Sequence, residues 1–203
     1  MQPLLGLPFA DPSAAVIGSL SGATYGGGVL KEGGGGMAGL GVGDGGVILT
    51  AEEVVGLMLK NIQGLGEHKV AQGGAAVLSC PGYFSDDQRE AMAKAGERAG
   101  MVILDTIHEP VAAVSSAMGM SLLSRDASKG LIAVLDVGGR SAQCSIVDAG
   151  STENGRPKLV GSYWTMETGG DQWDAAIVEL LDGEFRKANE GMSLKGDAMA
   201  LTR

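Results

Sequence analysis

An acidic residue followed closely by two glycines marks the segment of this chain best suited to chemistry on a metal-bound phosphate. Asp136 lies at the end of an apolar run, Gly138 and Gly139 follow it, and Ser141 adds a hydroxyl group. A carboxylate at a strand end can hold a hydrated Mg²⁺, and glycines let backbone N–H groups approach a phosphate. Taken alone, the segment DVGGRS is more typical of a plain β-hairpin than of a metal or phosphate site, so both interpretations stay open.

A second candidate carboxylate is Glu109, in the segment IHEPVAA. An apolar strand is expected to end just before it, and Pro110 suits the first turn of a following helix. Groups that act on ligands often lie at such strand-to-helix junctions. The structural alternative is that Glu109 only stabilises the helix by interacting favourably with its dipole.

The elements that position Glu109 are marked by helix boundary signals. Ser85, with Gln88 three residues later, predicts a capping box at the start of a helix. Gly100 is placed to end that helix, and residues 102–104 predict a short apolar strand. The order is therefore helix, strand, then Glu109 at the start of a second helix.

Short apolar segments and helical segments alternate over the rest of the chain from Thr50 onward, where Thr50 and Glu53 predict another capping box. Strands are predicted at 75–79, in two parts of 131–148 joined at Gly138-Gly139, and at 159–164 after a turn at Asn154-Gly155. Helices are predicted at 110–120 and around Trp173, Ile177, Leu180 and Leu181. This order predicts an α/β fold.

Composition narrows the possible functions. The chain has 203 residues, 44% of them hydrophobic and 19% charged, with a formal charge of −9. That charge argues against a nucleic-acid partner, and no apolar run approaches the roughly 20 residues of a membrane span. No targeting segment is visible. Cys80 and Cys144 lack metal-site spacing and are predicted to be buried, reduced thiols.

The segment 18–46 differs from the remainder because 14 of its 29 residues are glycine. Ordering so many glycines costs backbone entropy and offers few side chains to bury. No Lys-Ser or Lys-Thr pair follows the glycine runs, which disfavours a P-loop. The segment is therefore predicted to be a flexible loop.

Several of these segments together resemble the nucleotide-binding domain of the seventy-kilodalton heat-shock chaperones, which belong to the actin-like ATPase superfamily. The similar segments, in order, are LLGLPFADP, PGYFSDDQREAMAKAGERAG, IHEPVAA, LDVGGRSAQCSIV, TGGDQWD and EFRKANEGMSLKGDAMALTR. The last is most similar to bacterial and mitochondrial members. The resemblance implies a partial actin-like ATPase (ribonuclease-H-like) fold with parts of two lobes.

It also implies a division of the chain and a set of site residues. Residues 1–50 would be a remnant of the outer subdomain of the first lobe with the glycine-rich loop 18–46, and 51–125 its α/β core. Residues 126–168 would start the second-lobe sheet, and 169–203 the helical outer subdomain. Resemblance assigns catalysis to Glu109 and Asp136, with Asp136 holding Mg²⁺ through water. It assigns phosphate binding to Gly138, Gly139, Ser141, Gly169 and Gly170, and an allosteric switch to Pro81 and Arg89.

The implied cofactor is ATP or ADP with Mg²⁺, and the implied partners are unfolded polypeptide clients and co-chaperones. The implied location is the cytoplasm or the interior of a mitochondrion or plastid. Three positions depart from the family pattern: Arg140 replaces a loop glycine, Gln143 an aspartate near the metal, and Gln2 falls where the catalytic lysine would lie. A neutral amide cannot replace that ammonium group.

Two functions therefore remain open. The chain is expected to be the ATP-binding part of a chaperone, truncated and weakly active or inactive alone, because the first phosphate loop and the adenosine-binding segments are not in it. Alternatively it is a degenerate, non-catalytic relative that acts as a structural or interaction subunit. A small-molecule kinase of the same superfamily is a third possibility, but no segment resembles a sugar-binding one.

Overall fold

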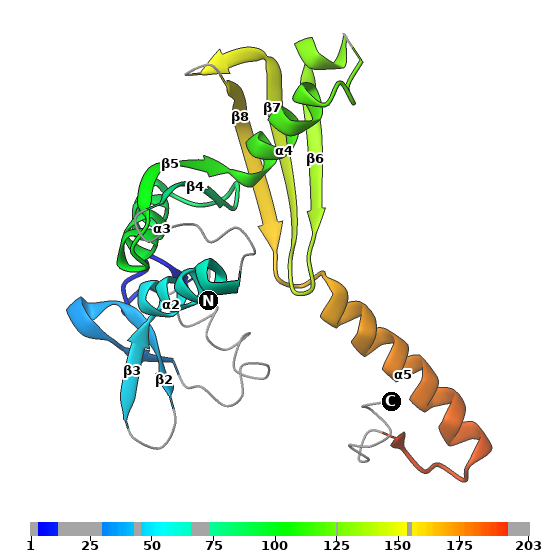
Figure 1. The fold of residues 1–203 in the computed structure, drawn as a ribbon. Coiled ribbons are helices and arrows are strands. Elements are labelled where there is room, and N and C mark those ends of the chain that lie inside the picture. Colours follow the sequence, from blue (N-terminus) through cyan, green and yellow to red (C-terminus); the bar gives the residue numbers. More distant parts are fainter. Residues whose placement is uncertain are drawn as a thin grey trace.

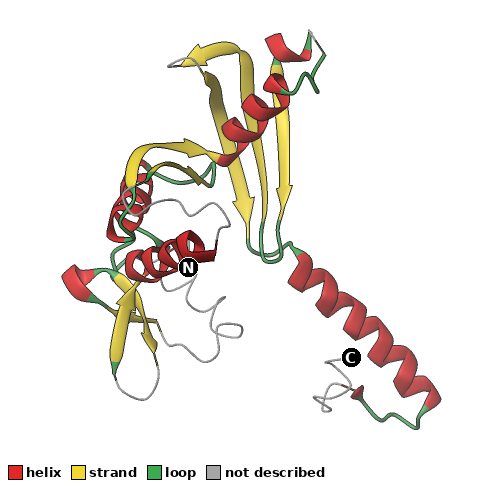
Figure 2. Cartoon of the chain, in the orientation of Figure 1, coloured by secondary structure: helices red, strands yellow, loops and turns green. Residues whose placement is uncertain are grey.

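The computed structural model describes residues 4–11, 30–42, 46–65, 74–124, 126–153 and 156–194, and it combines helices with three separate sheets (Figures 1 and 2). The predicted α/β fold is confirmed over these residues. Gln2 and the Asn154-Gly155 turn lie outside them. Within the described residues no helix is both long and apolar enough to cross a membrane.

The first sheet is antiparallel and small. It contains β1 (Leu30–Glu32), β2 (Ala38–Val42) and β3 (Val47–Thr50), with the 3₁₀ turn η2 (Gly34–Gly36) between β1 and β2. Residues 30–42 lie within the stretch expected to be a loop, but they form strands instead. One reason is that β2 alternates glycine with apolar residues, and a Cβ atom at Gly39 would come within 2.7 Å of the Leu49 carbonyl oxygen. Glycine therefore permits this close strand pairing.

The helix α2 (Ala51–Leu65) follows directly from β3. Its predicted capping box is present, because Glu53 accepts a hydrogen bond from the Thr50 backbone N–H at 2.8 Å and Thr50 Oγ1 accepts one from the Glu53 N–H at 3.3 Å. Such reciprocal bonds satisfy backbone donors that a helix end leaves unpaired. Helix α2 packs against α3 (Asp86–Arg98).

The second sheet is a parallel pair, β4 (Ala75–Cys80) and β5 (Val102–His108), connected through α3. Ser85 caps α3 in a complete capping box with Gln88. Gly100, with φ of +86°, ends the helix as predicted, and its N–H donates to the Glu97 carbonyl oxygen at 2.9 Å. Left-handed backbone at this position favours glycine.

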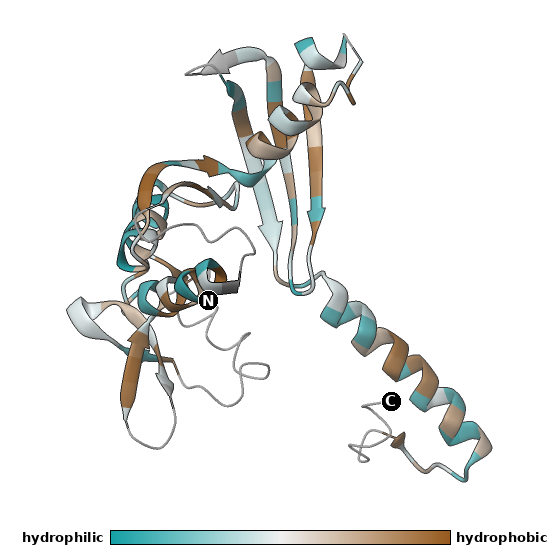
Figure 3. Ribbon diagram, viewed as in Figure 1, coloured by the Kyte–Doolittle hydropathy of each residue, from teal (hydrophilic) through white to brown (hydrophobic). Residues whose placement is uncertain are grey.

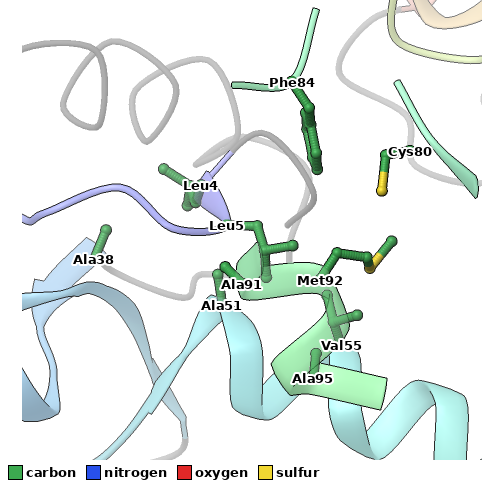
Figure 4. Packing of buried hydrophobic residues seen from close by; sticks show 10 residues of the cluster. All are labelled: Leu4, Leu5, Ala38, Ala51, Val55, Cys80, Phe84, Ala91, Met92 and Ala95. Carbon is green, nitrogen blue, oxygen red and sulfur yellow. The ribbon is translucent and has the colours of Figure 1, made fainter. Parts of the chain in front are cut away.

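These elements share one apolar core, in which the helices α2 and α3 meet the N-terminal residues 4–5 and the β4–α3 turn (Figure 4). Leu5, Cys80 and Ala95 are fully buried. The core therefore fixes α3 and the β4–α3 turn relative to each other. The full cluster is Leu4, Leu5, Ala38, Ala51, Val55, Cys80, Phe84, Ala91, Met92 and Ala95.

The third sheet is antiparallel, with β6 (Leu131–Val137), β7 (Ala142–Glu153) and β8 (Arg156–Thr165) in that order. Helix α4 (Glu109–Gly119), which continues directly from β5, crosses one face of this sheet (Figure 1). Val111 and Val114 of α4 pack on Val147 and Ala149 of β7 in a second core. Helix α4 thus joins the parallel pair to the third sheet. The 3₁₀ turn η3 (Ala127–Lys129) precedes β6.

The last helix, α5 (Gly170–Ala188), starts beside the β6–β7 turn and extends away from the other elements (Figure 1). Its middle turns are hydrophobic (Figure 3), and its exposed apolar side chains are Trp173, Ile177, Leu180 and Leu181. The chain after α5 folds back on it, because Asp182, only 2% exposed, accepts hydrogen bonds from Ser193 Oγ and from the Leu194 N–H.

Both cysteines are free. Cys80 is buried as predicted, but Cys144 is exposed, and that expectation was wrong. The reason is the strand period: Cys144 alternates with the buried Gln143 and Ser145 and points to the face of the third sheet away from α4.

Candidate functional site

Glu109 is the first residue of α4 and directly follows β5, as the sequence predicts. Pro110 occupies the first turn and is buried. No side chain caps this end, so Glu109 supplies the negative charge that the helix N-terminus favours. Glu109 is partly buried, which limits how its carboxylate can move.

Asp136 is the second-last residue of β6, and Gln143 lies directly opposite it on β7. Its neighbours along the same face of β6, Ile132 and Val134, pack against the core beneath α4. Asp136 therefore projects on the sheet face that carries α4, where Glu109 begins the helix. Unlike Gln143, Asp136 is exposed.

The two carboxylates interact. Burial of the Glu109 side chain, and then the negative charge of Asp136, raise the pKa of Glu109 above its ordinary value. Burial, Glu109 and Asp136 also raise the pKa of Tyr83 to about 12. Negative charge therefore gathers where α4 begins, near the end of β6.

Two glycine pairs from distant parts of the sequence pack together next to Asp136. The β6–β7 turn is closed by a hydrogen bond from the Gly138 N–H to the Ser141 carbonyl oxygen, 2.8 Å long. The start of α5 joins this turn, because the Gly170 N–H donates to the Gly138 oxygen at 3.1 Å and the Asp171 N–H to the Gly139 oxygen at 2.6 Å. The residues predicted to bind phosphate therefore lie at one place.

Chemically, this arrangement suits a hydrated Mg²⁺ better than a directly coordinated metal. No group of three or more metal-ligating side chains occurs within the described part of the chain. Carboxylate oxygens are hard ligands, and Mg²⁺ keeps several of its waters and uses one or two carboxylates. The repulsion between Glu109 and Asp136 is what a cation at this place would relieve. The residues thus fit the ion that the sequence implies.

Arg140, the first departure from the family pattern, has its side chain paired with Asp171. Its Nε lies 2.8 Å from a carboxylate oxygen of Asp171. Both side chains are partly exposed, at 29% and 47%. Arg140 therefore ties the β6–β7 turn to the first turn of α5.

Gln143, the second departure, has a defined structural role. It is buried, and its Oε1 atom accepts a hydrogen bond from the Gly82 backbone N–H at 3.0 Å. That bond joins the β4–α3 turn of the first core to β7 of the third sheet. A buried, hydrogen-bonded amide here adds no charge next to Asp136.

Pro81 lies in the same β4–α3 turn and is buried. Its carbonyl oxygen accepts a hydrogen bond from the Phe84 N–H and lies 3.2 Å from His108 Nδ1. Burial, opposed by that backbone contact and reinforced by the charge of Arg89, lowers the pKa of His108. Pro81 is thus connected to the residue that directly precedes Glu109.

Arg89 is more distant from the carboxylates. It pairs with Asp86 at 2.5 Å within α3 and lines a cavity of about 540 Å³ together with His108 and Asp105. Asp105 is itself paired with Arg156 of β8. Neither carboxylate of the candidate site and none of the paired glycines lines this cavity. The structure therefore brings Asp136, both glycine pairs and Ser141 together, with Glu109 close enough to Asp136 to be affected by its charge, while Arg89 lies to one side.

Sequence reasoning missed two aromatic residues at this site. The rings of Tyr83 and Trp164 are stacked, with centroids 4.3 Å apart and planes inclined by 17°. Nothing in the sequence pairs residue 83 with residue 164, since one lies in a turn and the other in a strand of another sheet.

A family model described as "Hsp70 protein" matches residues 29–203. The "Chaperone protein DnaK" of Mycoplasmoides gallisepticum is 33% identical over 156 residues, which cover 76% of this chain and 25% of that relative. The chain therefore spans about a quarter of that relative's length.

Proposed function

The chain belongs to the Hsp70 chaperone family, and we propose that it supplies the central part of an ATP·Mg²⁺ site within an ATP-dependent folding chaperone. The family assigns it to the actin-like ATPase fold, of which it contains a part.

One observation carries the proposal. The β6–β7 turn and the start of α5 are hydrogen-bonded through Gly138, Gly139 and Gly170, and they lie next to a pair of interacting carboxylates, Glu109 and Asp136. Phosphoryl transfer needs backbone donors around phosphate, a metal-holding carboxylate and a group that orients water. The two carboxylates offer the metal-holding and water-orienting groups, and the paired glycines, which carry no side chains, leave room for a phosphate to approach the turn beside them.

Each residue would have a separate task. Asp136 would accept hydrogen bonds from the water shell of Mg²⁺, which, when bound, neutralises charge on the phosphates. Glu109 would orient the attacking water molecule, and its raised pKa would make it a better proton acceptor. The small paired glycines would let the backbone approach the phosphate, with the Ser141 hydroxyl beside them.

We expect binding by this chain alone to be weak. Arg140 directly follows the glycine pair of the β6–β7 turn, and its guanidinium already pairs with Asp171. Phosphate would have to compete with that carboxylate for the guanidinium group. Clients, co-chaperones and a location in the cytoplasm, mitochondrion or plastid are expected by family membership alone.

Equilibrium titration of the purified chain with ATP, with and without Mg²⁺, tests the proposal. We expect weak, saturable binding that needs Mg²⁺ and falls at least about tenfold in Asp136→Asn, because one charge that holds the hydrated metal is removed. Asp174→Asn, on the exposed surface of α5, is the matched control and should bind as the parent chain does. Binding that ignores both Mg²⁺ and Asp136→Asn would contradict the proposal.

A second function has specific support. Arg140 and Gln143 each make a contact that stabilises the fold, with Asp171 and with Gly82 respectively. They would suit a non-catalytic structural or interaction subunit whose nucleotide site has been converted to fixed contacts. The double substitution Arg140→Gly with Gln143→Asp distinguishes the two. A rise in Mg·ATP affinity supports the ATP site, whereas no nucleotide binding in either form supports the subunit.

A further inference from the structure

The β4–α3 turn, residues 81–85, is held against the third sheet at Gly82, where an added side chain would be tightly packed. A Cβ atom on Gly82 would lie 3.0 Å from Ser162 Oγ and 3.1 Å from both Ser145 Oγ and Pro110 Cγ. The Gly82 N–H donates to Gln143 Oε1 at 3.0 Å in a buried setting. Because a buried, unpaired N–H is costly, this bond favours one position of the turn.

Stacked rings make a second contact between the same two parts. Tyr83 stacks on Trp164 of β8, and it also meets the ring of Phe84 edge-on at 5.6 Å. Phe84 belongs to the first core, which also contains Met92 and Leu5 (Figure 4). A continuous path of rings thus runs from that core to the third sheet.

The residues that make these contacts lie in one row across the third sheet. Asp136 of β6 is directly opposite Gln143 of β7, and Gln143 is directly opposite Trp164 of β8. Directly opposed residues in antiparallel strands lie on the same face of a sheet. The row therefore places the hydrogen-bond acceptor and the stacking ring on the face from which Asp136 projects.

The other side of the contact leads to Glu109. The carbonyl oxygen of Pro81 lies 3.2 Å from the His108 ring, and Glu109 is the next residue and the start of α4. Pro110, at the second position of α4, packs against Gly82 itself. Any shift of the turn away from the sheet would therefore disturb the beginning of α4.

We propose that Gln143 and Trp164 are positioning residues: they hold the β4–α3 turn, and with it Glu109, against the strand that carries Asp136 before any ligand is bound. The inference rests on the proposed function only in naming Glu109 and Asp136 as the groups that are positioned. In this proposal Gln143, which departs from the family pattern, holds the turn by accepting the Gly82 hydrogen bond, and Trp164 sets the distance between the turn and β8 by stacking on Tyr83.

Hydrogen exchange of the Gly82 amide, measured by NMR on the full chain without nucleotide, tests this directly. In the parent chain the Gly82 amide should be protected. In Gln143→Leu and in Trp164→Ala its exchange should become faster by about fivefold or more, the loss expected for one hydrogen bond or one stacked pair. The backbone resonances of Glu109 and Asp136 should shift in both variants, whereas the amides of α2 and α5 should keep their protection.

Conservative and control variants complete the test. Trp164→Phe keeps a ring that can stack and should restore both the Gly82 protection and the Glu109 resonance. Trp173→Phe, on the exposed face of α5, should change neither. If Trp164→Ala does not fold, Trp164→Leu replaces it with the same expectation, because leucine keeps apolar volume but has no ring face.

Three results would overturn the proposal: a parent Gly82 amide that exchanges like an exposed one, no acceleration in either variant, or acceleration without any shift at Glu109. Since the samples contain no nucleotide, none of these results bears on whether the chain binds ATP.

Discussion

The backbone of Gly169 lies directly against that of Ser141. A Cβ atom on Gly169 would come within 2.8 Å of the Ser141 nitrogen and within 2.9 Å of Arg140 backbone atoms. Since φ at Gly169 is 169°, the requirement for glycine comes from this close approach and not from backbone strain. The contact explains how α5 begins at the turn that follows Asp136.

Gly169→Ala should therefore separate the two turns. We expect a loss of about 1–3 kcal/mol in the free energy of unfolding, the range for overpacking a tight contact, measured by urea denaturation. Gly183→Ala is the matched control, because Gly183 lies inside α5 with open space at its Cβ position. It should gain roughly 0.5–1 kcal/mol, as alanine does in a helix interior. Equal effects of the two substitutions would disprove the tight contact.

The capping box of α3 gives a second prediction. Ser85→Ala removes the acceptor for the Gln88 N–H, now 3.2 Å away, and should cost about 0.5–2 kcal/mol. Ser79→Ala, on the exposed side of β4, should stay within roughly 0.5 kcal/mol of the parent. Denaturation followed by far-ultraviolet circular dichroism measures both. A Ser85→Ala protein as stable as Ser79→Ala would show that this box contributes little.

Burial, and then the charge of Glu109, raise the pKa of the Cys80 thiol from 9.0 to about 11. The unfolded chain therefore loses this proton at lower pH than the folded one does. The contribution of the Cys80 thiol to the free energy of unfolding is fully present below pH 9 and declines as pH rises toward 11. Between pH 8 and 10 the parent should lose about 1 kcal/mol more than Cys80→Ala does.

Unfolding free energies of both proteins across that range provide the measurement. Tyr83, whose pKa is also raised to about 12, is present in both and cancels in the comparison. Parallel stability curves for the two proteins would mean that the Cys80 thiol is not buried as described.

Much of the local structure could be predicted from the sequence because its signals are local. The capping boxes at Thr50 and Ser85, the helix end at Gly100 and the junction at Glu109 are each encoded within a few residues. The glycine content of residues 30–42 wrongly predicted a loop. Strand β2 forms there because it pairs with β3, and that partner is not visible in the composition of the segment. The division of the chain into lobes stays a prediction.

The contacts between distant segments could not be predicted in this way. Gln143 appeared only as a departure from a family pattern, yet it accepts a hydrogen bond from Gly82, 61 positions away. The Tyr83–Trp164 stack and the Arg140–Asp171 pair likewise depend on how separate sheets and turns meet. Residue spacing along the chain does not predict such contacts between distant segments.

The central claim is that Glu109, Asp136 and the two glycine pairs surround one site for metal-bound nucleotide. The most direct test replaces Mg²⁺ by paramagnetic Mn²⁺ with ATP and maps which backbone amides are broadened in NMR spectra of the chain. The account predicts that broadening starts at the amides of Glu109, Gly138, Gly139 and Gly170 and largely disappears in Asp136→Asn. Broadening centred elsewhere, or the same map in Asp136→Asn, would contradict it.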